Sequence, residues 1–202
     1  MIVILLITAS LCTFGIDFEN NLGVSEFACL KTNNIDLLVI RGYRSFGALD
    51  PYVNSNIKNA RAAGYKSIDV YMFPCVKCGN PKGQVDTMIS GITELYNMIW
   101  VDIEIFAWPD DKAANKAFIL EIVNEIKNKG KTVGIYSSAN NWQSIVGTDW
   151  TGVSALPLWY AHYDNVKAFS DFKPFGGWTK PAMKQFTDNS KLCGVVFDED
   201  FF

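Results

Sequence analysis

Short apolar runs alternate with segments of helical hydrophobic periodicity along most of the chain. The apolar runs predict eight strands, over Gly15–Phe18, Leu37–Arg41, Ser67–Phe73, Ile99–Ile105, Val133–Ser137, Leu156–Tyr160, Met183–Phe186 and Val195–Asp198. The helical patterns between the first five predict helices over Ser25–Asn33, Tyr52–Ala63, Lys82–Tyr96 and Lys112–Lys129. Repeated strand–helix alternation indicates a parallel sheet, and continuously apolar strands indicate that helices cover it.

Eight strands in one α/β chain favour a closed barrel over an open, doubly wound sheet. No linker or repeat interrupts the pattern, so we expect a single domain. Neither a Gly-x-Gly-x-x-Gly nor a Walker loop follows the first strand, which disfavours nucleotide binding. In a parallel barrel the functional groups lie at the carboxyl ends of the strands. Each polar residue near a strand end is therefore a candidate.

The first segment of the chain, Ile2–Leu11, is apolar but shorter than the ~20 residues that span a bilayer. It predicts a signal peptide over residues 1–12, followed by one catalytic domain over residues 13–202. The alternative is a buried first strand. No later apolar run is long enough for a membrane span. We accordingly expect a protein that is secreted or delivered to a phagosomal or lysosomal compartment.

Four cysteines remain if Cys12 leaves with the signal peptide, and an even number suggests two disulfides with three possible connectivities. Cys75 and Cys78 are close enough to pair locally, which would leave Cys29 to pair with Cys193. A redox pair or half of a zinc site are the alternatives. A Gly-Asn-Pro turn follows Cys78 and no second Cys-x-x-Cys exists, so we favour structural disulfides.

The amino-acid composition limits the classes of function that the chain can have. The chain has 202 residues, of which 49% are hydrophobic and 19% charged, so it can bury a sizeable core and is not disordered. Eighteen scattered Lys and Arg against 21 Asp and Glu disfavour nucleic acid as a partner. The single histidine, His162, disfavours a histidine metal site, and we expect neither metal nor cofactor. We interpret His162 as a surface or hydrogen-bonding residue and assign proton chemistry to carboxylates.

Four acidic residues occupy strand ends: Asp17, Asp102, Glu104 and Asp198. Spacing i, i+2 places Asp102 and Glu104 on one face of their strand, roughly 7 Å apart. Two carboxyl groups on one face push their pKa values apart, which supplies an acid beside a charged group. The first and last strands of a closed barrel are neighbours, so Asp17 and Asp198 would join the same mouth.

A cleft of four carboxylates without histidine fits glycoside hydrolysis. Two other interpretations remain open. An acidic residue at a strand end can simply cap a loop or pair with Arg41, and an oxygen-rich cluster can bind Mg²⁺ or Ca²⁺.

Several motifs together resemble the glycoside hydrolase family 25 lysozymes, the Chalaropsis-type muramidases, and especially secreted protist and nematode forms. They are Gly15-Ile-Asp17, Ile40-Arg-Gly-Tyr43, Val101-Asp-Ile-Glu104, Ile135-Tyr-Ser-Ser138, Leu158-Trp-Tyr-Ala-His-Tyr163, Lys184-Gln-Phe-Thr187 and Phe197-Asp-Glu-Asp-Phe-Phe202. The resemblance covers residues 15–202 and implies an irregular, flattened β/α barrel related to the TIM barrel. It also implies cleavage of the β-1,4 bond between N-acetylmuramic acid and N-acetylglucosamine in peptidoglycan.

Carried over by position, the resemblance makes Glu104 the general acid and lets Asp102 orient the 2-acetamido group or stabilise positive charge. Asp17 and Asp198 would complete the acidic cleft. The chain departs from the family at two places. Its third strand reads Asp69-Val-Tyr-Met-Phe73 where the family has Gly-x-Tyr-His-Phe, and Asp200 stands where Asn is common.

Aromatic residues after the strands suit a glycan groove, because sugar rings stack on aromatic faces. Tyr43, Tyr71, Tyr136 and Trp159 are the candidates that also match family positions, and Arg41 could hold a carboxylate ionised. We expect a monomer that acts on peptidoglycan strands, best at acidic pH. The alternatives are a glycan-binding protein that has lost catalysis and a carboxylate glycosidase acting on chitin-like glycans.

Overall fold

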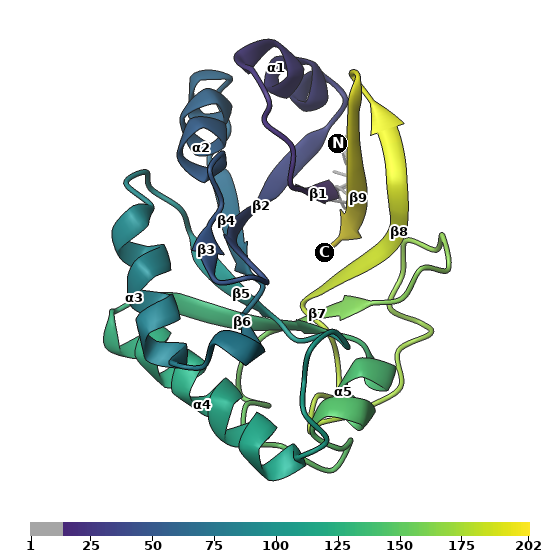
Figure 1. The fold of residues 1–202 in the computed structure, drawn as a ribbon. Helices are drawn as coiled ribbons and strands as arrows, with labels where there is room; N and C mark the ends of the chain where they lie inside the picture. Colours follow the sequence, from purple (N-terminus) through teal and green to yellow (C-terminus); the bar gives the residue numbers. More distant parts are fainter. Residues whose placement is uncertain (1–13) are drawn as a thin grey trace, which may run out of the picture.

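The computed structural model describes residues 14–202, which form one α/β domain around a closed barrel (Figure 1). The strands form a nine-stranded sheet in the order β1-β9-β8-β7-β6-β5-β4-β2-β3, and β1 also pairs with β2. That pairing closes eight strands into a ring and leaves β3 attached to β2 alone. The predicted barrel is confirmed. The predicted signal peptide falls on residues 1–12, outside the described residues.

The bounds of the elements follow the predicted pattern closely along the first half of the chain. In chain order they are β1 (Phe14–Phe18), α1 (Val24–Thr32), β2 (Ile35–Arg44), β3 (Ala48–Leu49), α2 (Val53–Ala62), β4 (Ser67–Met72), a 3-10 turn (Val76–Cys78), α3 (Pro81–Gly91), β5 (Met98–Asp102), α4 (Lys112–Asn128), β6 (Thr132–Ser137), α5 (Ala139–Ile145), β7 (Leu158–Ala161), β8 (Met183–Leu192) and β9 (Val195–Phe201).

The last strand departs from the predicted parallel sheet. β9 runs antiparallel to both of its neighbours, β1 and β8. β8 extends to Leu192, well beyond the predicted end at Phe186, and only Cys193 and Gly194 join it to β9. Both turn residues have positive φ, as a two-residue hairpin turn requires. So short a connection can join only antiparallel strands.

Three further boundaries differ from prediction. Helix α3 ends at Gly91, where the Asn54 side chain donates to the Gly91 carbonyl, instead of continuing to Tyr96. β5 ends at Asp102, so the predicted strand to Ile105 is wrong beyond that residue. The short helix α5 follows β6 and was not predicted; Ser138 begins it by accepting from the backbone N–H of Asn141.

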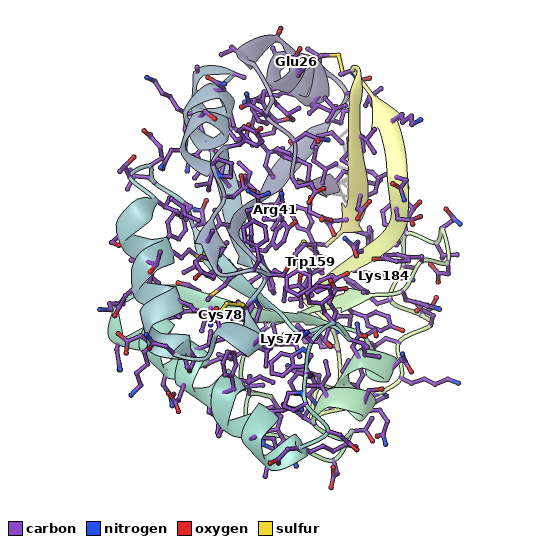
Figure 2. All side chains as sticks on the ribbon, in the orientation of Figure 1. Glu26, Arg41, Lys77, Cys78, Trp159 and Lys184 are labelled. Atoms are coloured by element: carbon purple, nitrogen blue, oxygen red, sulfur yellow. A yellow bond between two sulfur atoms is a disulfide. The ribbon has the colours of Figure 1, made fainter. Side chains whose placement is uncertain are left out.

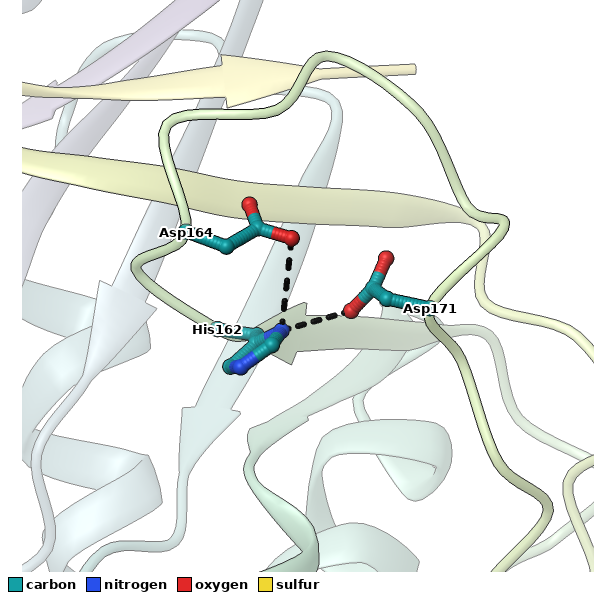
Figure 3. Close-up of side chains that lie close together, drawn as sticks. All are labelled: His162, Asp164 and Asp171. Atoms are coloured by element: carbon teal, nitrogen blue, oxygen red, sulfur yellow. Dashed lines mark hydrogen bonds and ion pairs between the residues drawn. The ribbon is translucent and has the colours of Figure 1, made fainter.

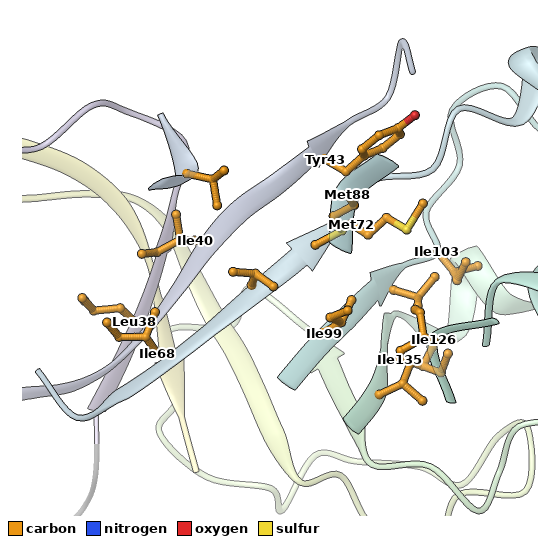
Figure 4. Packing of buried hydrophobic residues seen from close by; sticks show 14 of the residues in the cluster. Leu38, Ile40, Tyr43, Ile68, Met72, Met88, Ile99, Ile103, Ile126 and Ile135 are labelled. Carbon is orange, nitrogen blue, oxygen red and sulfur yellow. The ribbon is translucent and has the colours of Figure 1, made fainter. Parts of the chain in front are cut away.

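The helices cover the outer face of the barrel. Asp111 caps α4 by accepting from the backbone N–H groups of Ala113 and Ala114. The buried face of α4 then packs on the sheet: Figure 4 shows Ile126 beside Ile135 of β6, in the larger hydrophobic cluster of the protein. Alternate strand residues belong to this outer core, which leaves the others to fill the inside of the barrel.

A second, smaller cluster fills the barrel interior: Leu37, Val39, Trp100, Tyr136, Trp159 and Met183. The Trp100 ring lies over Gly134 on the adjacent strand β6. A Cβ atom at that glycine would come within 2.4 Å of the Trp100 ring, so only glycine leaves the space that the indole occupies. Figure 2 shows Trp159 near the middle of the molecule, between the two sides of the barrel.

Two buried aspartates that depart from the family pattern, Asp69 and Asp200, lie among these indoles. Trp100 donates to Asp69 with a distance of 2.9 Å between Nε1 and Oδ2, and Trp159 donates to Asp200 with 2.7 Å between Nε1 and Oδ1. The two indole rings contact each other edge to face, with centroids 5.8 Å apart. Asp69 and Asp200 are therefore hydrogen-bond acceptors for the tryptophans that fill the barrel.

The two predicted disulfides are present. Cys75 bonds to Cys78, and Cys29 of α1 bonds to Cys193 in the β8–β9 turn (Figure 2). The second bond joins residues 164 positions apart and fastens the final hairpin to the first helix. None of the helices in residues 14–202 combines the length and the hydropathy of a membrane span.

Asp69 provides a test of this interior. Burial raises its pKa from 3.8 to about 6, so its ionisation favours the unfolded chain and stability is lost as pH rises through that range. Asp69→Asn keeps an acceptor for Trp100 and removes the titration. The free energy of unfolding of wild type should fall between pH 3.5 and pH 7 because Asp69 ionises. In the variant we expect this fall to be smaller by about 3 kcal/mol. Urea unfolding at both pH values measures it, with the exposed Asp110→Asn as control; equal losses in wild type and Asp69→Asn would contradict the assignment.

Candidate active site

A cavity of about 280 Å³ opens at the carboxyl ends of the parallel strands. All four predicted catalytic carboxylates line it, together with four of the five predicted substrate-binding residues. These residues are Asp17, Asp102, Glu104, Asp198, Arg41, Tyr71, Tyr136 and Trp159. The structure thus brings together residues from seven strands and the loop after β5.

Tyr43 does not reach this cavity. It lies in the outer hydrophobic cluster and is 2% exposed. The register between β2 and β4 shifts between Arg41 and Tyr43, so the two side chains do not share a face: Arg41 lines the cavity, while Tyr43 packs near Met72 and Met88 (Figure 4). The expected role of Tyr43 in stacking on sugar is therefore replaced by a role in the core.

Asp17 and Asp198 face each other across the β1–β9 pair. The expectation that the first and last strands are neighbours is confirmed, but Asp198 does not end its strand, which continues to Phe201. The antiparallel register puts Asp198 opposite Asp17. Burial raises the pKa of Asp17 well above its ordinary value, and the charge of Asp198 raises it further. Burial also raises the pKa of Asp198.

Asp102 ends β5, and Glu104 follows in the loop. Glu104 reaches the same cavity as Asp102 because the chain turns after the strand, not because of strand alternation. Burial raises the pKa of Asp102 well above its ordinary value, with further contributions from the charges of Glu104 and Asp17. Burial raises the pKa of Glu104 as well. The Oδ1 atom of Asp102 is buried without a hydrogen-bond donor from residues 14–202.

Arg41 is the cationic side chain in the cavity wall, but acidic residues outside the four already occupy it. Its Nε lies 2.8 Å from Oδ2 of Asp50, and its guanidinium also pairs with Glu19. The expectation that Arg41 holds a catalytic carboxylate ionised is therefore not met by direct pairing. The four carboxylates share a cavity without an ion pair among the described residues, so no paired cation opposes the rise that burial causes in their pKa values.

The aromatic wall combines buried and exposed rings. Tyr136 and Trp159 pack edge to face, with ring centroids 4.6 Å apart, and Trp159 is almost fully buried. Tyr163 and Phe73 also line the cavity, and Phe73 packs edge to face on the exposed ring of Phe106. A sugar can therefore meet ring faces at the rim, whereas Trp159 offers little free surface.

A second cavity of about 390 Å³ adjoins the first. The two share Glu104, Tyr136 and Tyr163 in their walls, and the second is also lined by Asn140 and His162. Glu104 consequently lies at the junction of two hollows, where it can reach the atom that links two bound groups. This second hollow was not predicted, because much of its wall comes from the unpredicted start of helix α5 and from the end of β7 with the chain that follows.

His162, Asp164 and Asp171 lie close enough together to resemble a metal site (Figure 3). The Nδ1 atom of His162 lies 2.6 Å from Oδ2 of Asp171, in agreement with the hydrogen-bonding role predicted for this residue. The ammonium group of Lys184 already lies 2.8 Å from an oxygen of each aspartate. A cation is thus built into the cluster, which anchors the loop after β7 to β8.

Three further polar residues line the wall and were not predicted from the sequence: Glu19, Ser45 and Gln185. Gln185 makes the contacts that matter most for the carboxylates. It belongs to the motif Lys184-Gln-Phe-Thr187, which matched the family without suggesting a role. Its Nε2 donates to Oδ1 of Asp17 at 2.7 Å and to Oδ2 of Asp198 at 3.3 Å. The β8–β9 hairpin brings Gln185 near Asp198, 13 positions along the chain. The contact with Asp17 also needs the pairing of β9 with β1, so spacing along the chain carries no signal for it.

A deep acidic cavity with an acid of raised pKa at its junction to a second hollow suits the hydrolysis of a bond between two linked units. Comparisons with known proteins agree. The sequence model of the family Lys-1, described as lysozyme-like protein 1, matches residues 8–186. The probable GH family 25 lysozyme 2 of Dictyostelium discoideum is 42% identical over 191 residues, which cover 93% of this chain and 90% of the relative.

Lysozyme-like protein 5 of Caenorhabditis elegans is also 42% identical, over 193 residues that cover 93% of this chain and 90% of that protein. Among solved structures, the family GH25 lysozyme from Aspergillus fumigatus has the same fold. It superposes with a TM-score of 0.77 at 20% identity and covers 94% of this chain and 93% of its own. This chain therefore belongs to the glycoside hydrolase family 25 lysozymes and is a glycoside hydrolase.

Proposed function

We propose that this protein is an N-acetylmuramidase that hydrolyses the β-1,4 bond between N-acetylmuramic acid and N-acetylglucosamine in bacterial peptidoglycan. The observation that carries the proposal is the position of Glu104, a carboxyl group of raised pKa at the junction of two adjoining cavities. One sugar would occupy the acidic cavity and the next would occupy the hollow beside His162. Glu104 would then protonate the oxygen that links them.

The other carboxylates have complementary roles in this proposal. The carboxyl group of Asp102 lines the acidic cavity beside Glu104, where it would orient the 2-acetamido group of the sugar or stabilise positive charge. Asp17 and Asp198 lie on the opposite side of the barrel mouth and would stabilise the positive charge that develops on the sugar ring. Lysozyme relatives over nearly the whole chain support this substrate class.

We further propose that the protein acts outside the cytoplasm, by secretion or within a phagosomal or lysosomal compartment. Two disulfides are typical of oxidising compartments, and residues 1–12 have the pattern of a signal peptide. Degradation of bacterial walls for defence or feeding would follow from that location.

Replacing the proposed acid tests the mechanism. Glu104→Gln keeps the shape of the side chain and removes its proton donor, so we expect the rate of peptidoglycan digestion to fall by about 10²–10⁴-fold with binding retained. The release of reducing ends from purified peptidoglycan measures the rate, and identification of the new end sugar shows which bond breaks. Glu121→Gln, on the exposed face of α4, serves as a matched control.

The same assay distinguishes the alternatives. Wild type that binds peptidoglycan without releasing reducing ends would point to a glycan-binding protein. Turnover of chitin oligomers without turnover of peptidoglycan would point to a chitin-like substrate. Equal rates for wild type and Glu104→Gln would refute the role of Glu104.

The pH dependence follows from the same groups. Burial raises the pKa values of Glu104 and Asp102, so the protonated acid persists to higher pH than for an exposed carboxyl group and is lost as pH rises further. Acidic conditions also reduce repulsion between a chain of net charge −3 and an anionic wall. We expect activity on peptidoglycan to peak at acidic pH. A profile measured at constant ionic strength that peaks well above neutrality would contradict this expectation.

A further inference from the structure

Gln185 connects the two sides of the acidic cavity through a complete set of hydrogen bonds. Its amide nitrogen donates to Asp17 and Asp198, while its Oε1 accepts from the hydroxyl of Tyr136 at 2.6 Å and from that of Tyr163 at 2.8 Å. The residue is only 2% exposed. A side-chain amide has two donor hydrogens and an oxygen with two lone pairs, so every position is used.

The partners determine which way the amide faces. Two carboxylates can only accept while ionised, and the reversed amide would direct its oxygen at both of them. The two tyrosine hydroxyls must therefore donate to Oε1. Their oxygens are then left to accept hydrogen bonds from a bound substrate, and the donor and acceptor pattern of this wall follows from a single side chain.

The backbone of Gln185 is held on both sides. Its carbonyl accepts from the backbone N–H of His162 at 3.0 Å, and the preceding residue, Lys184, is fully buried and paired with Asp164 and Asp171. The register of β8 against β9 shifts just after Gln185, as in a β-bulge, a feature that often directs a side chain into a site. The side chain thus projects from a rigid base.

The amide of Gln185 donates to two carboxyl groups that repel each other when both are ionised. Asp17 and Asp198 are directly opposite each other on paired strands, an arrangement in which like charges repel. The other charged or titratable groups around the pair are Glu19, Arg41, Tyr71, Asp102, Glu104, Tyr136, Tyr163, Asp188 and Asp200. Arg41 is the one cation among these groups and it pairs with Asp50 and Glu19, so a neutral donor is what stabilises an ionised carboxylate here.

We propose that Gln185 is a positioning residue that holds Asp17 and Asp198 as one hydrogen-bonded pair and keeps that pair negatively charged for catalysis. The inference rests on the proposed hydrolase function only for its effect on rate; the ionisation of the pair can be measured without substrate. Gln185 does not need to touch the reacting atoms.

Two substitutions test the proposal. Gln185→Met has a similar volume and no hydrogen bonds, and Gln185→Glu keeps an acceptor for the tyrosines but loses the amide donors. The bond from Gln185 lowers the pKa of Asp17. Without it, we expect the carboxyl group of Asp17 to keep its proton to a pH higher by about one unit or more, with the larger change in Gln185→Glu, which adds a further acid.

The carboxyl carbons of ¹³C-labelled aspartate, followed by NMR across the pH range, report this titration, and Asp17→Asn and Asp198→Asn assign the signals. The acidic limb of the pH–rate profile on peptidoglycan should shift to higher pH by the same number of pH units. Gln84 supplies matched controls, because it is a second buried glutamine whose side chain bonds the backbone of Cys75 and Gly79. Gln84→Met and Gln84→Glu should lower stability without moving either curve.

The possible results distinguish a failure of the positioning role from a failure of the proposed function. If Gln185→Met and Gln185→Glu lower the melting temperature as the Gln84 variants do, but leave the aspartate titrations and the acidic limb in place, Gln185 is merely structural and the proposal is wrong. If wild type hydrolyses no glycan while the titrations move as expected, the proposed function fails and the positioning role stands. If only one of the Gln185 variants folds, its titration alone decides.

Discussion

The burial of carboxyl groups inside a closed barrel is the constraint on which this molecule depends. Asp17, Asp69, Asp102 and Asp200 all lie buried inside the barrel. Each ionised group so placed loses hydration, so each needs a proton or a donor in exchange. Indole N–H groups supply donors to Asp69 and Asp200, and an amide supplies one to Asp17. Asp102 receives none from the described residues and keeps its raised pKa at the mouth.

This arrangement divides the barrel into two levels. In the lower level, two indoles fill the interior and bind carboxylates that have no access to the cavity. In the upper level, the carboxylates line a hollow large enough for part of a glycan. The same side chain can belong to both: Trp159 donates to Asp200 below and also borders the cavity above. Packing of the interior and ionisation of the site are therefore coupled through shared residues.

Much of the architecture could be predicted because local rules decided it. Helices α1, α2 and α4 begin and end near the predicted residues, since a terminus such as that of α4 depends on a neighbouring side chain, Asp111. The end of α3 was predicted wrongly, and Asn54, which donates to the Gly91 carbonyl there, lies 37 positions away in the chain. The direction of β9 was predicted wrongly, although the turn that reverses it lies in the sequence. Cysteine is an uncommon residue at positive φ, so the pair Cys193 and Gly194 is a weak turn signal, and a disulfide to Cys29 stabilises it.

The sequence by itself determined the alternation of elements and favoured the local Cys75–Cys78 disulfide, because periodicity and short spacing are local properties of the chain. It also singled out four acidic residues near strand ends. Only the tertiary structure decided which side chains share the cavity. The register of β2 turned Tyr43 into the outer core, and the antiparallel β9 set Asp198 opposite Asp17. The pairing of β9 with β1 brought Gln185 to Asp17, because contacts between residues about 170 positions apart in the chain depend on strand order and register, which no short segment encodes.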